Sequence, residues 1–129
     1  RALNGLAPIV YDGGKQTRCF TFIDDAIDAT IAVFQNNITI GEVYNIGSNV
    51  ESTMEGVTDL IIDLSGNKCK IEQISTTEFY GDKYQDIIRR IPDVSKIKRD
   101  LGWKANTSLK TGISETIQCA RNNSRWLNL

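Results

Sequence analysis

Short runs of apolar residues alternate with polar stretches along the chain, and their spacing predicts both strands and helices. Four runs are rich in β-branched and aromatic residues and predict short strands: residues 7–11, 18–23, 42–46 and 70–75. The first two flank a polar loop, residues 12–17, which opens with Asp-Gly-Gly, a strong turn signal. An ordinary hairpin is one interpretation of this pair of extended segments.

Four other stretches place apolar residues at helical spacing. In the first of them, Ile27, Ile31 and Phe34 fall on one face of a helix. The capping signals expected at the four helix starts are Asp24 or Asp25, Ser52 with Glu55, Asp93, and Ser108. Gly66 and Gly102 are expected to end the second and third helices.

The composition is that of a globular domain, with 40% hydrophobic and 24% charged residues among 129. Because short strands alternate with helices without a repeat or a linker, residues 1–129 are predicted to form a single α/β domain. A net charge of −1 provides no general basic surface, so nucleic acid is not an expected partner. The absence of histidine excludes an imidazole base, a Ser-His nucleophile and the usual zinc sites.

The cysteines and the chain start bear on where the protein is found. None of the three cysteines forms a Cys-x-x-Cys pair, which favours a reduced, cytoplasmic setting. No apolar run reaches the roughly 20 residues of a membrane span, so no membrane association is expected. The chain starts at Arg1 without an initiator methionine or a signal peptide, and we expect it to be part of a longer protein.

The loop before the second predicted strand gathers hydrogen-bond donors within one short turn. These backbone N–H, ammonium, amide, hydroxyl and guanidinium groups belong to Gly14, Lys15, Gln16, Thr17 and Arg18. Such a set suits a phosphate ester. The spacing is not that of a P-loop, and a solvated turn without a ligand is the alternative.

A second polar segment, residues 80–92, contains Tyr84 and the adjacent Arg89 and Arg90 and has no clear periodicity. An arginine here could hold a diphosphate or a carboxylate through two hydrogen bonds, or donate a proton to a developing carbanion. The alternative is a solvated basic turn before Pro92.

No site for a dinucleotide is expected within this chain, because no Gly-x-Gly-x-x-Gly pattern opens a helix. Tyr11 and Lys15 do have the spacing of a Tyr-x-x-x-Lys dyad. Such a pair needs a helix to share one face, however, and the residues between them form a turn.

Four segments resemble the C-terminal part of the extended short-chain dehydrogenases: residues 13–25, Tyr-Asn-Ile-Gly at 44–47, residues 84–93 and Leu-Gly-Trp at 101–103. The likeness covers nearly the whole chain. Within that family, the chain is most similar to the UDP-glucuronate decarboxylase domains of the polymyxin-resistance enzymes, which modify lipid A, and next to the UDP-xylose synthases.

The resemblance implies an α/β substrate-binding part whose N-terminal Rossmann half, absent here, binds NAD. By its similarity to the decarboxylases, the parent enzyme is expected to be a cytoplasmic homo-oligomer in which NAD oxidises C4 of UDP-glucuronate, CO2 is lost and the resulting enolate is protonated. By position, Gly14, Lys15, Gln16, Thr17 and Arg18 would hold the UDP portion. Tyr84 would line the sugar-nucleotide pocket, and Arg90 would match the general acid.

Two other functions fit the same residues. A nucleotide-sugar 4-epimerase or 4,6-dehydratase would use the same loop without a decarboxylation step. A noncatalytic module that binds a sugar nucleotide or another protein would need no dinucleotide fingerprint.

Overall fold

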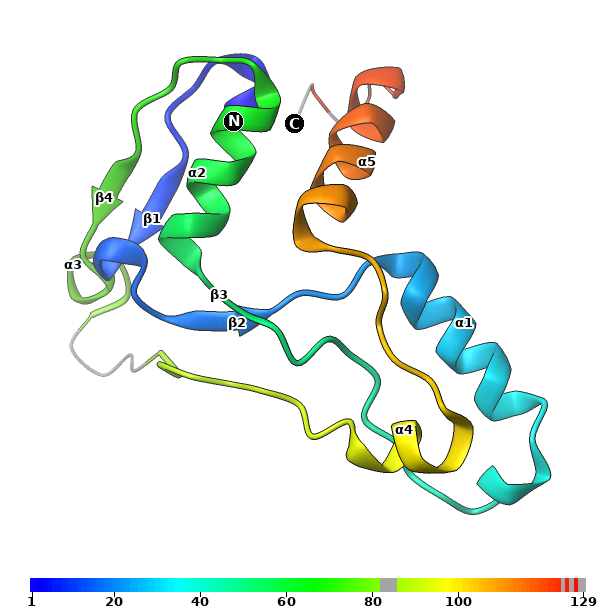
Figure 1. The fold of residues 1–129 in the computed structure, drawn as a ribbon. Coiled ribbons are helices and arrows are strands. Elements are labelled where there is room, and N and C mark those ends of the chain that lie inside the picture. The colour runs from blue at the N-terminus through cyan, green and yellow to red at the C-terminus, as the bar shows by residue number, and fades with distance from the viewer. Residues whose placement is uncertain (82–85, 124, 126, 128–129) are drawn as a thin grey trace.

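The computed structural model describes residues 1–81, 86–123, 125 and 127. Its strands are β1 (Ile9–Tyr11), β2 (Thr17–Cys19), β3 (Glu51–Thr53) and β4 (Glu72–Ile74). Its α-helices are α1 (Ile23–Phe34), α2 (Met54–Ser65), α3 (Thr76–Tyr80), α4 (Ser95–Leu101) and α5 (Leu109–Asn122), and its 3-10 turns are η1 (Ala2–Asn4), η2 (Asp12–Gly14) and η3 (Asn37–Thr39). Helices alternate with short strands, as predicted, and described residues near both ends of the chain meet, since Asn4 Nδ2 donates to the Leu127 carbonyl at 2.8 Å (Figure 1).

The strands form two separate pairs. β1 runs parallel to β4, with Val10 opposite Gln73, whereas β2 runs antiparallel to β3, with Arg18 opposite Ser52. The hairpin interpretation of residues 7–23 is therefore wrong. The chain passes through η2, where Gly13 and Gly14 have positive φ angles, and leaves one sheet for the other.

The predicted strand at residues 42–46 is wrong, because no strand is assigned there. Side chains anchor this stretch instead. The Tyr44 hydroxyl donates to an Asp100 carboxylate oxygen at 3.0 Å, and Asn45 Nδ2 donates to the Asp93 carbonyl at 3.0 Å. The strand that does form nearby, β3, was not predicted.

Local stop and start signals are confirmed at three helix ends. Gly66 and Gly102 follow α2 and α4 with φ angles of 72° and 66°, the left-handed region that favours glycine. At the start of α5, the Ser108 hydroxyl accepts a hydrogen bond from the Thr111 N–H at 3.1 Å. These signals act within a few residues and do not depend on distant packing.

Two other predicted caps differ from the structure. The cap of α2 is not Ser52 with Glu55 but Thr53, whose hydroxyl accepts from the Gly56 N–H at 3.1 Å. Ser52 pairs within β3, so its backbone is committed to a strand. Before α4, Asp93 accepts from the N–H of Ser95 at 2.9 Å, although the formal cap position is one residue later.

Asp25 does not cap α1, which follows Phe22 and contains Asp24 and Asp25 in its first turn. Asp25 is 8% exposed, and its carboxylate accepts a hydrogen bond from the Thr107 N–H at 2.9 Å. Burial raises the pKa of Asp25, but hydrogen bonds from Thr107 and Asn106 outweigh it and hold this pKa below its usual value. Asp25 thus joins α1 to the segment before α5.

We expect Asp25→Ala to lower the free energy of unfolding by about 1–3 kcal/mol, because the part-buried Thr107 N–H loses its charged acceptor. A lowered pKa in the folded state means that this stabilisation is present above the unfolded pKa of about 3.9 and is lost as the pH falls further. Urea unfolding at pH 7 and at pH 3 checks both points. Asp24→Ala, at an exposed position of the same turn, is the control, and an equal loss in both variants would contradict the assignment.

The core of the described residues is small. Ile97 is its one large, fully buried side chain, joined by smaller residues such as Val10, Ala29 and Val57. α1 packs through Ala29, whereas the apolar face predicted for it is exposed. Ile27, Ile31 and Phe34 are 48%, 47% and 89% exposed.

Candidate functional site

β2 lies between two extended segments. β3 pairs with one of its edges, and residues 86–90, here called the 86–90 segment, lie along the other. The Thr17 N–H donates to the Ile88 carbonyl at 2.9 Å, and Thr17 forms an isolated parallel bridge with Arg89. The loop and the second polar segment, which are some 70 residues apart in sequence, therefore meet at β2 (Figure 1).

Adjacent residues of an extended segment point to opposite faces. Arg89 lies beside Thr17 on one face, while Arg90 and Arg18 line a cavity of about 450 Å³. We call this space the arginine cavity; its lining residues are Arg18, Cys19, Asn45, Arg90, Ile91, Pro92 and Asp93. Two guanidinium groups at one cavity suit a ligand with a diphosphate or a carboxylate.

The two arginines of this cavity are held differently. Arg18 donates from Nη1 to the Thr17 and Ile87 carbonyls at 2.8 and 2.7 Å, and from Nη2 to an Asp86 oxygen at 2.9 Å. The Arg90 side chain forms no hydrogen bond or ion pair with another residue in the described ranges. Arg18 therefore fixes the 86–90 segment, and the donors of Arg90 are available to a ligand.

The other loop residues have different surroundings. Gly14 is buried against the start of α2, where an added Cβ would lie 2.6 Å from the Glu55 nitrogen. Lys15 is exposed. The Gln16 carbonyl accepts from the Met54 N–H at 3.1 Å, and the Thr17 hydroxyl donates to Glu51 at 2.9 Å. None of these four residues lines the arginine cavity. Tyr84 lies outside the described residues.

Glu51 is a member of the site that the sequence did not indicate. Its carboxylate accepts from Nε and Nη2 of Arg89 at 2.9 and 2.8 Å, and also from the Thr17 hydroxyl. The hydrogen bonds from Arg89 and then from Thr17 lower the pKa of Glu51, and the carboxylate raises the pKa of Arg89. Glu51 was missed because β3 was not predicted. The opposite faces of Arg89 and Arg90 follow from their adjacency once the segment is known to be extended.

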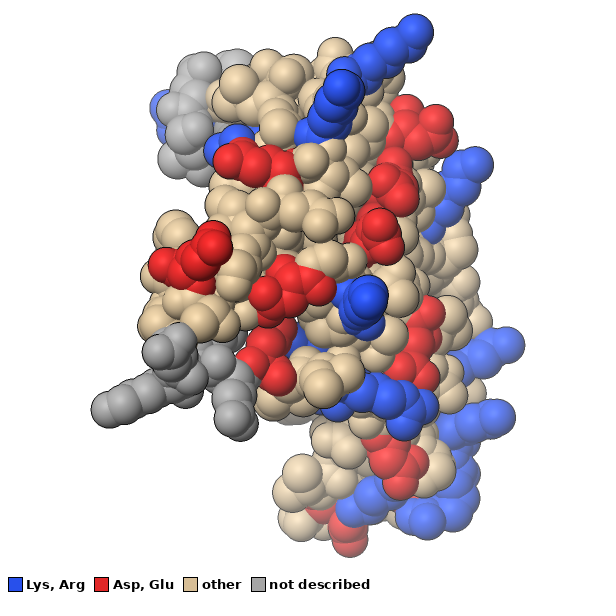
Figure 2. All heavy atoms as spheres, turned by 90° about the vertical axis from the view of Figure 1, so that its left-hand side faces the viewer, with Lys and Arg blue, Asp and Glu red and all other residues tan. Residues whose placement is uncertain are grey.

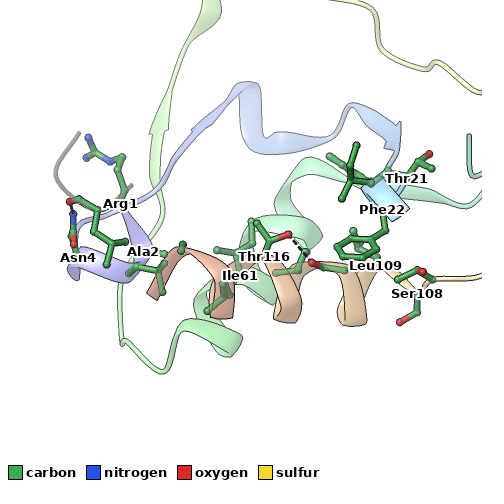
Figure 3. Close-up of a pocket in the computed structure, with 18 residues that line it drawn as sticks. Arg1, Ala2, Asn4, Thr21, Phe22, Ile61, Ser108, Leu109 and Thr116 are labelled. Carbon is green, nitrogen blue, oxygen red and sulfur yellow. Dashed lines mark hydrogen bonds between the residues drawn. The ribbon is translucent and has the colours of Figure 1, made fainter. Parts of the chain in front are cut away.

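A larger cavity of about 610 Å³ lies between η1, α2, α5 and residues 20–23 (Figure 3). Its lining is mainly apolar. Phe22 packs against α5 at Gly112, where an added Cβ would lie 3.1 Å from the ring. The charged residue of this lining is Arg1, whose guanidinium donates hydrogen bonds to the Ala7 carbonyl and to a Glu72 carboxylate oxygen. For an anionic ligand, the smaller arginine cavity is therefore the better candidate.

The surface and the helices add two observations. Acidic and basic side chains are intermingled on the face that carries β4 and α3 (Figure 2). Across the described part of the chain, no helix is long and apolar enough to cross a membrane, and no group of three or more Asp, Glu, His or Cys side chains could hold a metal ion.

Comparison with known proteins identifies the family. The model of the family described as GDP-mannose 4,6 dehydratase matches residues 1–116. The chain is 39% identical to the UDP-N-acetyl-alpha-D-glucosaminuronate decarboxylase of Bacillus cytotoxicus, over 93% of the chain and 37% of that relative. It is 33% identical to the bifunctional polymyxin resistance protein ArnA of Wigglesworthia glossinidia brevipalpis, over 95% of the chain and 20% of that relative. The chain thus spans less than two fifths of each relative.

A solved structure shows the same fold. The dTDP-glucose 4,6-dehydratase of Bacillus anthracis, in complex with NAD, is 30% identical, with a TM-score of 0.80 over 97% of this chain and 38% of that one. The match is to the C-terminal part of such enzymes, as the sequence resemblance implied. The chain therefore belongs to the GDP-mannose 4,6-dehydratase family of extended short-chain dehydrogenases, a family of enzymes that modify nucleotide sugars.

Proposed function

We propose that this chain is the substrate-binding part of an NAD-dependent UDP-glucuronate oxidative decarboxylase. The observation that carries the proposal is that Arg18 and Arg90 line one cavity, and that no other described residue occupies the donors of Arg90. A UDP-sugar acid carries a diphosphate and a carboxylate, and both favour charge-assisted hydrogen bonds from guanidinium groups. The decarboxylases among the relatives act on substrates of this class, as their names state.

The residues present do not fit NAD itself. α1 and α2 follow Phe22 and Thr53 rather than a glycine-rich turn, so neither start offers the backbone approach that a dinucleotide needs. The cofactor, which would accept the hydride from the sugar, would be bound by residues outside this chain. The part proposed for this chain is to hold the nucleotide and, through Arg90, to protonate the enolate that remains after CO2 is lost.

Arginine is a weak acid in water, so protonation by Arg90 requires a closed, polarising pocket. In this chain the arginine cavity is open to solvent and Arg90 is exposed. The exposed apolar face of α1 and the small core support a larger protein whose other residues cover these surfaces. Closure of the cavity would come from that remainder.

The test of the proposed function is product analysis with the full-length enzyme. We expect UDP-glucuronate and NAD to yield CO2 with either a UDP-4-ketopentose and NADH or, where the hydride returns to C4, a UDP-pentose and regenerated NAD. No turnover is expected from this chain alone, because the missing part positions the cofactor. Release of UDP-galacturonate without CO2 would show a 4-epimerase instead. Binding of UDP-glucuronate by the full-length protein with no product at all would support a noncatalytic module.

We expect Arg18→Ala in the full-length enzyme to raise the dissociation constant for UDP by roughly tenfold or more, because a charge-assisted hydrogen bond contributes about 1.5–3 kcal/mol. Arg18 also holds Asp86, so Asp86→Asn is the matched control: it weakens that ion pair and keeps the guanidinium. Calorimetric titration with UDP measures both. Unchanged affinity in Arg18→Ala would show that Arg18 serves only to fix the 86–90 segment.

A further inference from the structure

We propose that the ion pair between Glu51 and Arg89 is a positioning device that sets the register of the 86–90 segment and thereby directs Arg90 into the arginine cavity. The inference deepens the proposed function, since it assigns a role to two residues that do not line the cavity. It rests on the geometry around β2.

The contact between Glu51 and Arg89 has the geometry of a specific pair. Both carboxylate oxygens accept, one from Nε at 2.9 Å and the other from Nη2 at 2.8 Å. This two-bond arrangement fixes direction as well as distance. The Thr17 hydroxyl donates to the same carboxylate at 2.9 Å, so the pair joins β3, β2 and the 86–90 segment.

The backbone alone holds this segment weakly. Between β2 and the segment, the described residues share an isolated bridge, with the Thr17 N–H donating to the Ile88 carbonyl. A register set by so short a pairing is easily displaced, and a slip of one residue moves every side chain to the opposite face. Additional contacts are needed to select one register.

Because two arginines are adjacent, such a slip would still leave Glu51 with an arginine partner. After a slip of one residue, Arg90 could pair with Glu51, and Arg89 would no longer lie on that face. Two contacts oppose this exchange: Arg89 with Glu51 on one face, and Arg18 with the Ile87 carbonyl and Asp86 on the other. Because Arg89 occupies the Glu51 carboxylate, Arg90 has no side-chain partner among the described residues.

The pair contributes little to global stability. The side chains of Arg89 and Glu51 are 66% and 29% exposed, and exposed ion pairs stabilise proteins weakly. A loss of activity in variants of this pair, without a loss of thermal stability, would therefore indicate that the pair acts by positioning Arg90.

The test uses the full-length enzyme with Glu51→Gln, Arg89→Gln and the double variant. We expect each single change to lower kcat about tenfold or more, because misplacement by about 1 Å can cost on the order of a hundredfold. KM and the melting temperature should change little. The double variant should be no slower than the slower single one, since both remove the same contact.

Two further variants sharpen the test. The exchange Glu51→Arg with Arg89→Glu should restore part of the lost kcat, because the pair can form again with its charges reversed. Arg99→Gln is the matched control: Arg99 is 70% exposed and forms a similar two-bond pair with Asp100, away from the 86–90 segment. It should leave kcat unchanged.

Hydrogen exchange separates this inference from the proposed function. In Glu51→Gln, the Thr17 amide should exchange faster, whatever product the enzyme makes, because its acceptor Ile88 is less well fixed. Unchanged exchange together with unchanged kcat would overturn the positioning role. A loss of kcat in the double variant equal to the product of the two single losses would also overturn the positioning role. Formation of an epimer by the wild-type enzyme would overturn only the decarboxylase assignment.

Discussion

Replacing Arg90 with methionine is expected to lower kcat of the full-length enzyme by on the order of a hundredfold or more, with a smaller change in KM. That range is usual for the loss of a positioned acid or base. Methionine keeps much of the side-chain volume but removes the charge and every donor. A residue that protonates the enolate acts in the transition state, so its loss appears in kcat, whereas a residue that only holds the ground state affects mainly KM.

Steady-state kinetics with UDP-glucuronate, together with UDP affinity, measure this effect. UDP binding and the fold should be largely retained, because the Arg90 side chain is exposed and forms no contact with the other described side chains through a hydrogen bond or ion pair. Arg99→Met, an exposed arginine on α4, is the control for the loss of a surface charge. A kcat near that of the wild type in Arg90→Met would exclude the general-acid role.

Gly14→Ala is expected to lower the free energy of unfolding by about 2–5 kcal/mol, the sum of a left-handed backbone and an overpacked contact. Gly14 has a φ angle of 64°, which favours glycine. Its added Cβ would also lie 2.6 Å from the backbone nitrogen of Glu55 and 2.7 Å from a methyl group of Val10. A backbone atom cannot move aside cheaply, so the packing of η2 on α2 would be disturbed.

Gly13→Ala is the matched control, because Gly13 has a similar φ angle of 70° but no atom within 4 Å of an added Cβ. It should cost only the backbone strain, about 1–2 kcal/mol. Urea unfolding of both variants measures the difference. Equal losses would show that the contact with α2 is not tight, and would leave Gly14 available for the ligand-binding role that its position in the loop suggests.

The sequence alone predicted the features that depend on near neighbours. Gly66 and Gly102 end helices because a glycine adopts the left-handed conformation there, and Ser108 caps α5 through a hydrogen bond three residues ahead. The β-prone runs around β1 and β4 were also identifiable. The family resemblance pointed to the match with the C-terminal part of extended short-chain dehydrogenases, which the comparisons confirm.

The tertiary structure decided which segments meet, because such contacts depend on residues far apart in the chain. β1 pairs with β4 rather than with β2, and Asp25 bonds the Thr107 N–H instead of capping α1. The apolar spacing of α1 predicted its helix but not its exposure, since periodicity shows which residues share a face and not what covers that face.

The candidate site shows the same division. The sequence offered Arg18 as a binding residue and, through the resemblance, Arg90 as the general acid, but it gave no means to place the two together. The pairing of Thr17 with Arg89 at the edge of β2 decides this, because it sets Arg89 against Glu51 and leaves Arg90 at the cavity with Arg18. Side-chain alternation along an extended segment is a local property. Which face each side chain occupies depends on the register, which is set by contacts between residues far apart in the chain.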